Sequence, residues 1–270
     1  MAKPEGKRGA VIVIPARYAS SRYPGKPLAE LELPDGSRKS LIRLSWEAAC
    51  RVPSVAGVHV ATDDDRIRAA CDEFGASTIM TSESCRNGTE RCAEALERAG
   101  LAADVVVNLQ GDAPLTPPWF VEAILTAMAE PEVHVATPVL PAVDSVHAHL
   151  TDDRRKGLIG ATTAVFDVNG DALYFSKEVL PRTDSSGSES AHPIWHHVGL
   201  YAYRTETLKA YRGLPEGSLE RAEGLEQLRF LEHGMKIRCV PVDARERAFW
   251  ELNNPSDVPR IEMALKEQMT

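Results

Sequence analysis

Features that would define several protein classes are missing from this sequence. The longest apolar runs, such as residues 10–14, are far shorter than the roughly 18 residues that a membrane span needs. Residues 1–9 are charged and no long apolar stretch follows them, so we expect no secretory signal peptide. The 5 cysteines include no CxxC pair, which argues against a zinc site and favours free thiols. We therefore expect a cytoplasmic protein with no membrane partner.

Positive charge is also in deficit. There are 31 Lys and Arg residues against 39 Asp and Glu residues, which gives a net charge of -8. A net-acidic chain is a poor general binder of nucleic acid, so an anionic ligand requires a local basic pocket. With 43% hydrophobic and 26% charged residues, the composition excludes collagen, coiled coil and general disorder. The 270 residues suit one large domain or two small ones.

What the sequence does contain is an alternation of short apolar strands and amphipathic helices over residues 10–130. The run AVIVI at residues 10–14 is apolar on both faces and β-branched, which is typical of a strand buried inside a parallel sheet. Strands are predicted at residues 10–14, 57–61, 78–80 and 104–109, and helices at residues 40–51, 66–74, 88–99 and 119–129. This alternation predicts an α/β fold with a mostly parallel, Rossmann-like sheet covered by helices.

The second half of the chain is less regular. Residues 141–195 lack a clear period and include a Ser- and Gly-rich stretch that predicts a loop. Further strands are predicted at residues 133–140, 198–204 and 237–242, and further helices at residues 219–233 and 259–268. With no internal repeat and no linker, we expect a single domain over residues 1–270. Its core would span about residues 10–130 and 197–265, and an insertion at about residues 133–196 would serve dimerisation.

A loop at residues 15–28 follows the first strand and carries three cations, Arg17, Arg22 and Lys26. Prolines stiffen this loop, and Gly25 lets the backbone approach a ligand closely. Cations on a stiff loop at the carboxyl end of a strand suit a polyphosphate, and a solvated surface loop is the alternative. Because neither GxxxxGK[ST] nor GxGxxG is present, a P-loop or dinucleotide-binding site is not indicated.

Acidic and imidazole side chains follow other predicted strands. Asp112 lies in a turn bounded by Gly and Pro, where one carboxylate can bind Mg²⁺ beside phosphate oxygens, and a plain turn residue is the alternative. The three aspartates at residues 63–65 resemble the metal motif of sugar-nucleotide glycosyltransferases, but an N-cap for the next helix explains them as well. His196 and His197 are adjacent and point to opposite faces of a strand, so at most one is expected to serve a site.

An ordered set of motifs resembles that of the 3-deoxy-manno-octulosonate (Kdo) cytidylyltransferases, also called CMP-Kdo synthetases. The resemblance covers about residues 10–262 and begins with IPARYASSRYPGKPL at residues 14–28. Further matching segments follow in order: ATD (61–63), NGTER (87–91), VNLQGD (107–112), ALYFS (172–176), HVGLYAYR (197–204) and LEQLR (225–229). The resemblance implies a nucleotidyltransferase fold, a homodimer and the Mg²⁺-dependent joining of CTP to a sugar acid with release of pyrophosphate.

The resemblance also implies roles for individual residues. Those expected to be catalytic are Arg17, Lys26 and Asp112. Those expected to contact CTP are Pro15, Ala16, Arg17, Arg22, Lys26, Asn87, Gly88, Arg91 and Gln110. Those expected to contact the acid substrate are His197, Tyr201, Glu226 and Gln227. The expected Mg²⁺ ligands are Asp112 and Asn253.

The sequence departs from the family pattern at three places. The usual Gln-Gly-Asp-Glu-Pro has Ala113 in place of Glu, residues 85–87 replace the usual His-Gln-Ser, and Asn253 stands where the family has its second metal carboxylate. An amide oxygen can bind Mg²⁺ but adds no charge. Fewer carboxylates lower the repulsion on a highly anionic acceptor. We therefore expect a small acid of the phosphonoformate type as the acceptor, with Kdo as the alternative.

Two other functions stay open at this point. A glycosyltransferase of the same fold would use residues 63–65 for its metal, and a regulator would bind CTP without turning it over. The cytidylyltransferase needs no protein nucleophile, because an acceptor oxygen attacks the α-phosphorus in line and catalysis is positioning and charge neutralisation. Release of pyrophosphate from CTP and acid separates this transferase from the other two.

Overall fold

The computed structural model describes residues 9–20, 23–142, 162–182, 194–247 and 249–269. Its strands are β1 (Ala10–Ala16), β2 (Glu30–Glu32), β3 (Arg38–Ser40), β4 (Val55–Thr62), β5 (Ser77–Met80), β6 (Val105–Leu109), β7 (Val135–Pro141), β8 (Thr162–Phe166), β9 (Ala172–Ser176), β10 (Trp195–His197), β11 (Leu200–Arg204) and β12 (Arg238–Pro241). Its α-helices are α1 (Leu41–Cys50), α2 (Asp65–Glu73), α3 (Gly88–Arg98), α4 (Pro118–Ala127), α6 (Thr205–Tyr211), α7 (Ser218–Glu223), α8 (Leu228–Glu232) and α9 (Val258–Met269).

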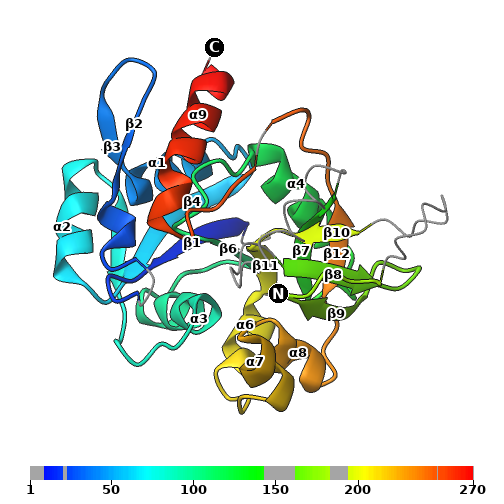
Figure 1. Ribbon diagram of the computed structural model, residues 1–270. Coiled ribbons are helices and arrows are strands. Elements are labelled where there is room, and N and C mark those ends of the chain that lie inside the picture. Colours follow the sequence, from blue (N-terminus) through cyan, green and yellow to red (C-terminus); the bar gives the residue numbers. More distant parts are fainter. Residues whose placement is uncertain (1–8, 21–22, 143–161, 183–193, 248, 270) are drawn as a thin grey trace, which may run out of the picture.

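One large sheet organises the chain, in the strand order β5-β4-β1-β6-β11-β7-β10-β8-β9, with β12 paired to β7 (Figure 1). The strands β5, β4, β1 and β6 are parallel, so their carboxyl ends meet at one edge. From β11 onward the pairs of the main path are antiparallel. The predicted α/β fold is confirmed, with the parallel strands β5, β4, β1 and β6 on one side of the sheet.

Helices cover both faces of the sheet, and the alternation of side chains along β1 explains why. Val11 and Val13 belong to an apolar cluster that includes side chains of α3, α6 and α8. Ile12 and Ile14 face the other way, into a cluster with side chains of α1, α2 and α4. In Figure 1, α3 and α6 to α8 accordingly lie below the sheet, and α1 and α4 lie above it. A strand buried on both faces must be apolar throughout, which is what the AVIVI run predicted.

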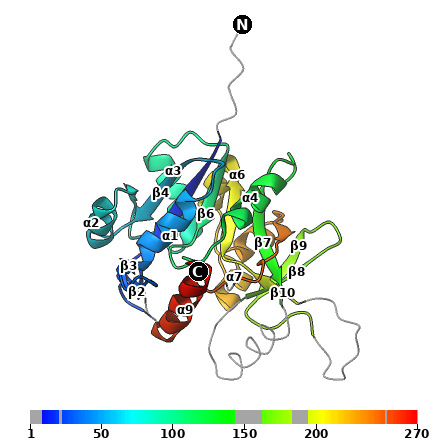
Figure 2. The same cartoon turned by 90° about the horizontal axis from the view of Figure 1, so that it is seen from above.

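A third apolar cluster joins the end of the chain to the β2–β3 hairpin (Figure 2). Leu31 and Leu33 of the hairpin pack there with Ile261 and Leu265 of α9. Leu252, which is 0% exposed, belongs to the same cluster. The segment that carries Leu252 is therefore packed against the β2–β3 hairpin, α1 and α9.

The predicted helix at residues 219–233 is wrong in one respect. The structure has two short helices there, α7 and α8, because Gly224 ends α7 in a left-handed conformation with φ of 61°. A glycine adopts this conformation without a steric penalty and is a common helix terminator. Because of this break, residues 224–227 form a loop between the two helices. This loop lines the cavities described below.

The predicted insertion is less separate than expected. The described part of residues 133–196 continues the main sheet, since β7 lies between β11 and β10, followed by β8 and β9. Residues 143–161 and 183–193 lie outside the described residues, and the expected role of this region in dimerisation stays a prediction. All 5 cysteines are free, as predicted. Within the described ranges, each helix is too short or too polar to cross a bilayer.

Candidate active site

A cavity of about 450 Å³ lies at the carboxyl ends of β1 and β6, where open parallel sheets usually bind ligands. Its wall comes from the loop after β1, the start of α3, the turn after β6 and residues 224–229. The residues predicted to contact CTP that line it are Pro15, Ala16, Arg17, Lys26, Asn87, Gly88, Arg91 and Gln110. Arg22 lies outside the described residues.

A second cavity of about 410 Å³ adjoins the first. The four residues predicted to contact the acid substrate, His197, Tyr201, Glu226 and Gln227, all line it. The two cavities share Gln110, Asp112 and the loop 224–227 as a common wall. The structure therefore brings both predicted residue sets together, with Asp112 between them.

Two of the predicted cations differ in how they are held. Arg17 is exposed at the rim of the first cavity and forms no ion pair with another described residue. The Lys26 Nζ donates a short hydrogen bond to the Asp112 carboxylate, and both side chains are mostly buried. Lys26 is therefore aimed at the position where the two cavities meet. A phosphate group or a cation that binds there competes for one member of this pair.

The backbone around Asp112 is held from three sides. A Cβ on Gly111 would lie 3.0 Å from the Pro15 carbonyl oxygen, so only glycine lets this turn approach the end of β1 so closely. The Ser45 hydroxyl of α1 donates to the Gly111 carbonyl at 3.0 Å. The Leu252 N–H donates to the Asp112 carbonyl at 2.9 Å. These contacts fix the backbone at Asp112 relative to the loop after β1.

Two residues predicted to contact CTP, Asn87 and Arg91, already form side-chain contacts within the protein. The Asn87 Oδ1 caps α3 by accepting a hydrogen bond from the Glu90 N–H at 2.8 Å. Arg91 is 3% exposed and pairs with Asp63 at 2.8 Å, and it also donates to the Thr81 hydroxyl at 2.6 Å. Both residues line the first cavity, but these contacts show them in a structural role.

The aspartates at residues 63–65 do not form a metal motif. The Asp64 Oδ1 accepts a hydrogen bond from the Arg66 N–H at 2.9 Å and caps α2. Asp63 is paired with Arg91, and Asp65 with Arg68. None of the three lines either cavity. The helix-cap interpretation is confirmed, and the sequence feature that favoured a glycosyltransferase has a structural explanation.

Glu226 fastens the loop 224–227 to the start of α3. Its carboxylate accepts hydrogen bonds from the Gly88 N–H at 3.0 Å and the Thr89 N–H at 3.1 Å, and from the Thr89 hydroxyl at 2.7 Å. Burial raises the pKa of Glu226, although these hydrogen bonds act in the opposite direction. Glu226 was predicted from the resemblance to face the acid substrate, and it lines both cavities while holding their walls together.

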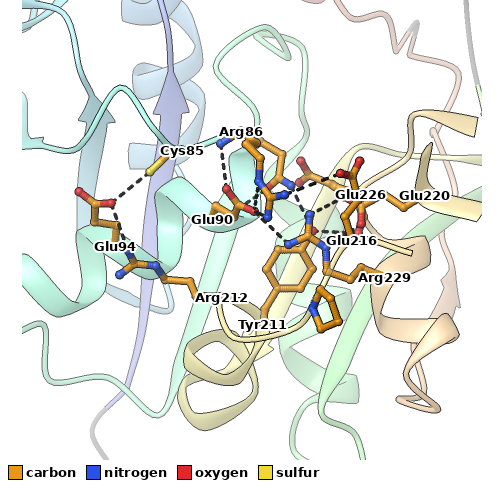
Figure 3. Close-up of polar contacts among 12 residues, drawn as sticks. Cys85, Arg86, Glu90, Glu94, Tyr211, Arg212, Glu216, Glu220, Glu226 and Arg229 are labelled. Carbon is orange, nitrogen blue, oxygen red and sulfur yellow. Dashed lines mark hydrogen bonds and ion pairs between the residues drawn. The ribbon is translucent and has the colours of Figure 1, made fainter. Parts of the chain in front are cut away.

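A buried ion-pair network supports the same wall (Figure 3). Arg229, which is 1% exposed, donates two hydrogen bonds of 2.6 Å to the Glu220 carboxylate. A third hydrogen bond, of 2.9 Å, joins it to Glu90 of α3. Its guanidinium also lies 4.4 Å from the centre of the Tyr211 ring. Through these contacts α3, α6, α7 and α8 form one unit on that side of the first cavity.

The second cavity contains a neutral, buried imidazole. His197 is 6% exposed and lies between the Phe175 and Tyr201 rings, at 4.9 and 5.4 Å from their centres. Burial, and to a lesser degree the neighbouring His196, lowers the pKa of His197 to about 3. His196 packs on Phe249 instead. Both histidines contribute to the cavity wall, which alternation along a strand did not predict.

The lowered pKa of His197 makes stability depend on pH. Below pH 6.5 the unfolded chain takes up a proton at this residue and the folded chain does not, so stability falls as the pH falls towards about 3. By linkage, this residue destabilises the fold by about 1 kcal/mol near pH 5.5 relative to pH 8. Urea unfolding at both pH values should show a smaller acid loss in His197→Asn than in the wild type. The exposed His233→Asn is the matched control, and identical losses in all three proteins would contradict the expectation.

Two buried polar groups in the second cavity lack partners. Among the described residues, neither the His197 Nε2 nor the Gln227 Nε2 has a hydrogen-bond partner, and Gln227 is 3% exposed. Leaving such groups unpaired costs free energy, which a bound polar ligand recovers. Lys177 adds a cation to the same wall. The cavity therefore suits an acid that also carries hydrogen-bonding groups.

Glu251 lines the second cavity and was missed from the sequence. Its Oε1 accepts a hydrogen bond from the Gly199 N–H at 3.3 Å. Burial, together with the nearby Asp112 carboxylate, raises the pKa of Glu251 to about 7. A signal was present: Glu251 and Asn253 flank the apolar Leu252, and residues two apart on an extended segment share a face.

Oxygen donors in the second cavity fit Mg²⁺ better than they fit zinc. Among the described residues, no group of three or more His, Cys, Asp and Glu side chains is arranged to hold a metal ion. Mg²⁺ needs no such cage, because it usually binds one or two protein carboxylates together with substrate phosphates. Asp112, Glu251 and the amide of Asn253 all line this cavity and fit that pattern in number and chemistry.

Comparisons with known proteins agree with this geometry. A family model described as Cytidylyltransferase matches residues 11–237. The chain is 43% identical over 255 residues to the 3-deoxy-manno-octulosonate cytidylyltransferase of Maricaulis maris (strain MCS10), covering 93% of this chain and 95% of the relative. The chain belongs to the Kdo cytidylyltransferase family. A mitochondrial member from Arabidopsis thaliana is 39% identical over 261 residues, covering 96% of this chain and 83% of the relative.

Solved structures give the same family. A CMP:2-keto-3-deoxy-manno-octonic acid synthetase in complex with CTP has a TM-score of 0.81 and 37% identity to the chain. The match covers 97% of this chain and 100% of that one. A 4-diphosphocytidyl-2C-methyl-D-erythritol synthase from Anaerococcus prevotii DSM 20548, with 12% identity and a TM-score of 0.58, shows the fold alone. The nucleotidyltransferase fold predicted from the motifs is confirmed.

The prediction of a phosphonoformate-type acceptor is contradicted, because the relatives at up to 43% identity are Kdo enzymes. The structure shows why the charge argument failed. Ala113 is 2% exposed and lines neither cavity, so the missing carboxylate there does not change the charge of the acceptor site. Glu251, which the count of carboxylates by motif position left out, lines the same cavity as Asn253.

Proposed function

We propose that this Kdo cytidylyltransferase family member transfers the cytidylyl group of CTP to Kdo and releases pyrophosphate. One observation carries the proposal: two cavities of similar volume adjoin at Asp112, one beside a cationic loop and one with a polar wall. A reaction between a nucleotide and a second substrate needs such an arrangement, because the reacting atoms must meet at one position. The CTP complex of the family relative supports CTP as the nucleotide substrate, and the cationic loop favours the first cavity for it.

In the first cavity, the triphosphate would lie along the loop after β1. Arg17, at the rim, would bind a phosphate oxygen, and Lys26 would exchange its bond to Asp112 for one to a phosphate. That exchange frees the Asp112 carboxylate for Mg²⁺. When bound, Mg²⁺ would neutralise charge that develops on the phosphate oxygens.

In the second cavity, the acceptor would be recognised by neutral donors and one cation. His197 and Gln227 would donate to or accept from its polar groups, and Lys177 would attract its carboxylate. The acceptor oxygen would face the α-phosphorus across the common wall at Gln110 and Asp112. No protein nucleophile is required. We also propose Mg²⁺ dependence and a homodimer, and the cytoplasmic location stays a prediction.

The test is to supply the purified full chain with CTP, Mg²⁺ and Kdo and to measure pyrophosphate together with the CMP-linked acid. We expect both products in equal amounts, and neither product when Kdo or CTP is left out. A CTP-binding regulator releases no pyrophosphate under these conditions, and a glycosyltransferase releases none from CTP. Absence of pyrophosphate from a folded, CTP-binding protein would therefore contradict the proposed function.

A further inference from the structure

A carboxylate that no family motif supplied lies in the acceptor cavity. Glu251, Asn253 and Asp112 all line this cavity, whereas Leu252 between the first two is buried in the apolar cluster under α9. The alternation puts Glu251 and Asn253 on one face of an extended segment, two positions apart. Glu251 can therefore reach the region that a carboxylate at position 253 would reach.

The segment is held next to the turn of Asp112 by the backbone. The Leu252 N–H donates to the Asp112 carbonyl at 2.9 Å, and the Gly199 N–H donates to the Glu251 Oε1 at 3.3 Å. A Cβ on Gly199 would lie 2.8 Å from the same Oε1. The hydrogen bond from Gly199 to Oε1 thus fixes the orientation of the Glu251 carboxylate, and its second oxygen is available to bind a ligand.

Nothing among the described residues neutralises Glu251. It forms no ion pair there, and Lys26, which lies nearest to Asp112, is already bonded to that carboxylate. Two carboxylates that face one cavity repel each other, and a proton or a cation that binds between them relieves the repulsion. Independently, the unpaired Nε2 of Gln227, a residue 3% exposed in the same wall, indicates that the cavity is built around a ligand.

We propose that Glu251, together with Asp112, binds the divalent cation of this enzyme and supplies the second carboxylate that Asn253 cannot. The inference rests on the proposed function for the identity of the nucleotide that brings the cation in. The amide oxygen of Asn253 is left as a neutral neighbour. The metal site would then still have two carboxylates, although the second one comes from a residue two positions before Asn253.

The experiment measures Mn²⁺ binding to the full chain by electron paramagnetic resonance, with saturating CTP and no acceptor. We expect Glu251→Gln to weaken Mn²⁺ binding tenfold or more, and the exposed Glu73→Gln to leave it unchanged. The double variant Glu251→Gln/Asn253→Asp returns a carboxylate to position 253 and should recover most of the affinity. CTP binding in EDTA should be the same in all of these proteins, which shows that each is folded.

The outcomes separate this inference from the proposed function. Mn²⁺ affinity within twofold of the wild type in Glu251→Gln would overturn the inference, whatever the enzyme does with Kdo. The inference also fails if Glu251→Gln binds Mn²⁺ normally but has a changed pH profile of turnover, because Glu251 would then act on the acceptor. Weakened Mn²⁺ binding in Glu251→Gln supports the metal role even if the wild type does not accept Kdo.

Discussion

We expect the replacement of Asp112 with Asn to lower kcat/KM for CMP-Kdo formation by a factor on the order of 10³. This carboxylate lies in the common wall of both cavities and is bonded to Lys26. Asparagine keeps the size of the side chain but removes the charge that attracts Mg²⁺. Loss of a bound metal removes several kcal/mol of charge stabilisation from the transition state, and each 1.4 kcal/mol, roughly, is a factor of ten.

The measurement is a Mg²⁺ titration of initial rates in the wild type, Asp112→Asn and the control Asp72→Asn. Asp72 is exposed on α2, far along the chain from the turn, and lines neither cavity. Asp112→Asn should need far more Mg²⁺ or stay inactive at any concentration, and Asp72→Asn should match the wild type. A Mg²⁺ dependence of Asp112→Asn identical to that of the wild type would remove Asp112 from the metal site.

Replacing Arg229 with Met should destabilise the fold by about 3–5 kcal/mol, because it leaves the buried Glu220 carboxylate without its cation and leaves Glu90 paired with Arg86 alone. Arg229 is 1% exposed, and its partners Glu220 and Glu90 are 6% and 7% exposed. Methionine fills much of the same volume, so the expected loss comes from charge rather than from a cavity. Arg212, which is 37% exposed, pairs with Glu97 and also contacts Glu94 (Figure 3), which keeps Arg98 as a second partner. Arg212 should therefore contribute at most about 1 kcal/mol.

Urea unfolding of Arg229→Met, Arg212→Met and the double variant Arg229→Met/Glu220→Gln measures these differences. The double variant should regain part of the stability lost in Arg229→Met, because it removes one of the uncompensated charges. Equal losses at Arg229 and Arg212, or a double variant less stable than Arg229→Met alone, would show that the buried pair is not what stabilises this wall.

The parallel strands and the position of the first cavity were predictable because each signal was local, whereas β2, β3, β8, β9 and β10 were missed. A strand buried on both faces, such as β1, must be apolar throughout, and the loop that follows a parallel strand opens at the ligand-binding edge. The ordered motifs indicated which residues line the two cavities, and the roles of those residues stay predictions. The break at Gly224 was missed because apolar spacing continues through it, while the glycine changes only the backbone direction.

The remaining errors concern side chains whose partners are distant in sequence. Nothing near Arg91 in the sequence reveals that Asp63 neutralises it, and nothing near Asn87 reveals its contact with Tyr211. The acceptor was mispredicted for the same reason, because carboxylates were counted by motif position although only those that face the cavity act on its ligand. Ala113 faces the interior and Glu251 faces the cavity, and only the folded arrangement distinguishes them.

The hydrogen bond from Leu252 to the turn of Asp112 has a consequence for the order in which the enzyme is made. A ribosome completes the cationic loop and the turn early, while the segment that packs behind them is among the last to emerge. Both cavities also need the late loop 224–227, and the second cavity needs Glu251 and Asn253, so neither cavity has its full wall until most of the chain has been made. A chain that stops short of α9 lacks the packing of Leu252 against the β2–β3 hairpin, so we expect the segment that carries Glu251 to take up its position only once α9 has folded there.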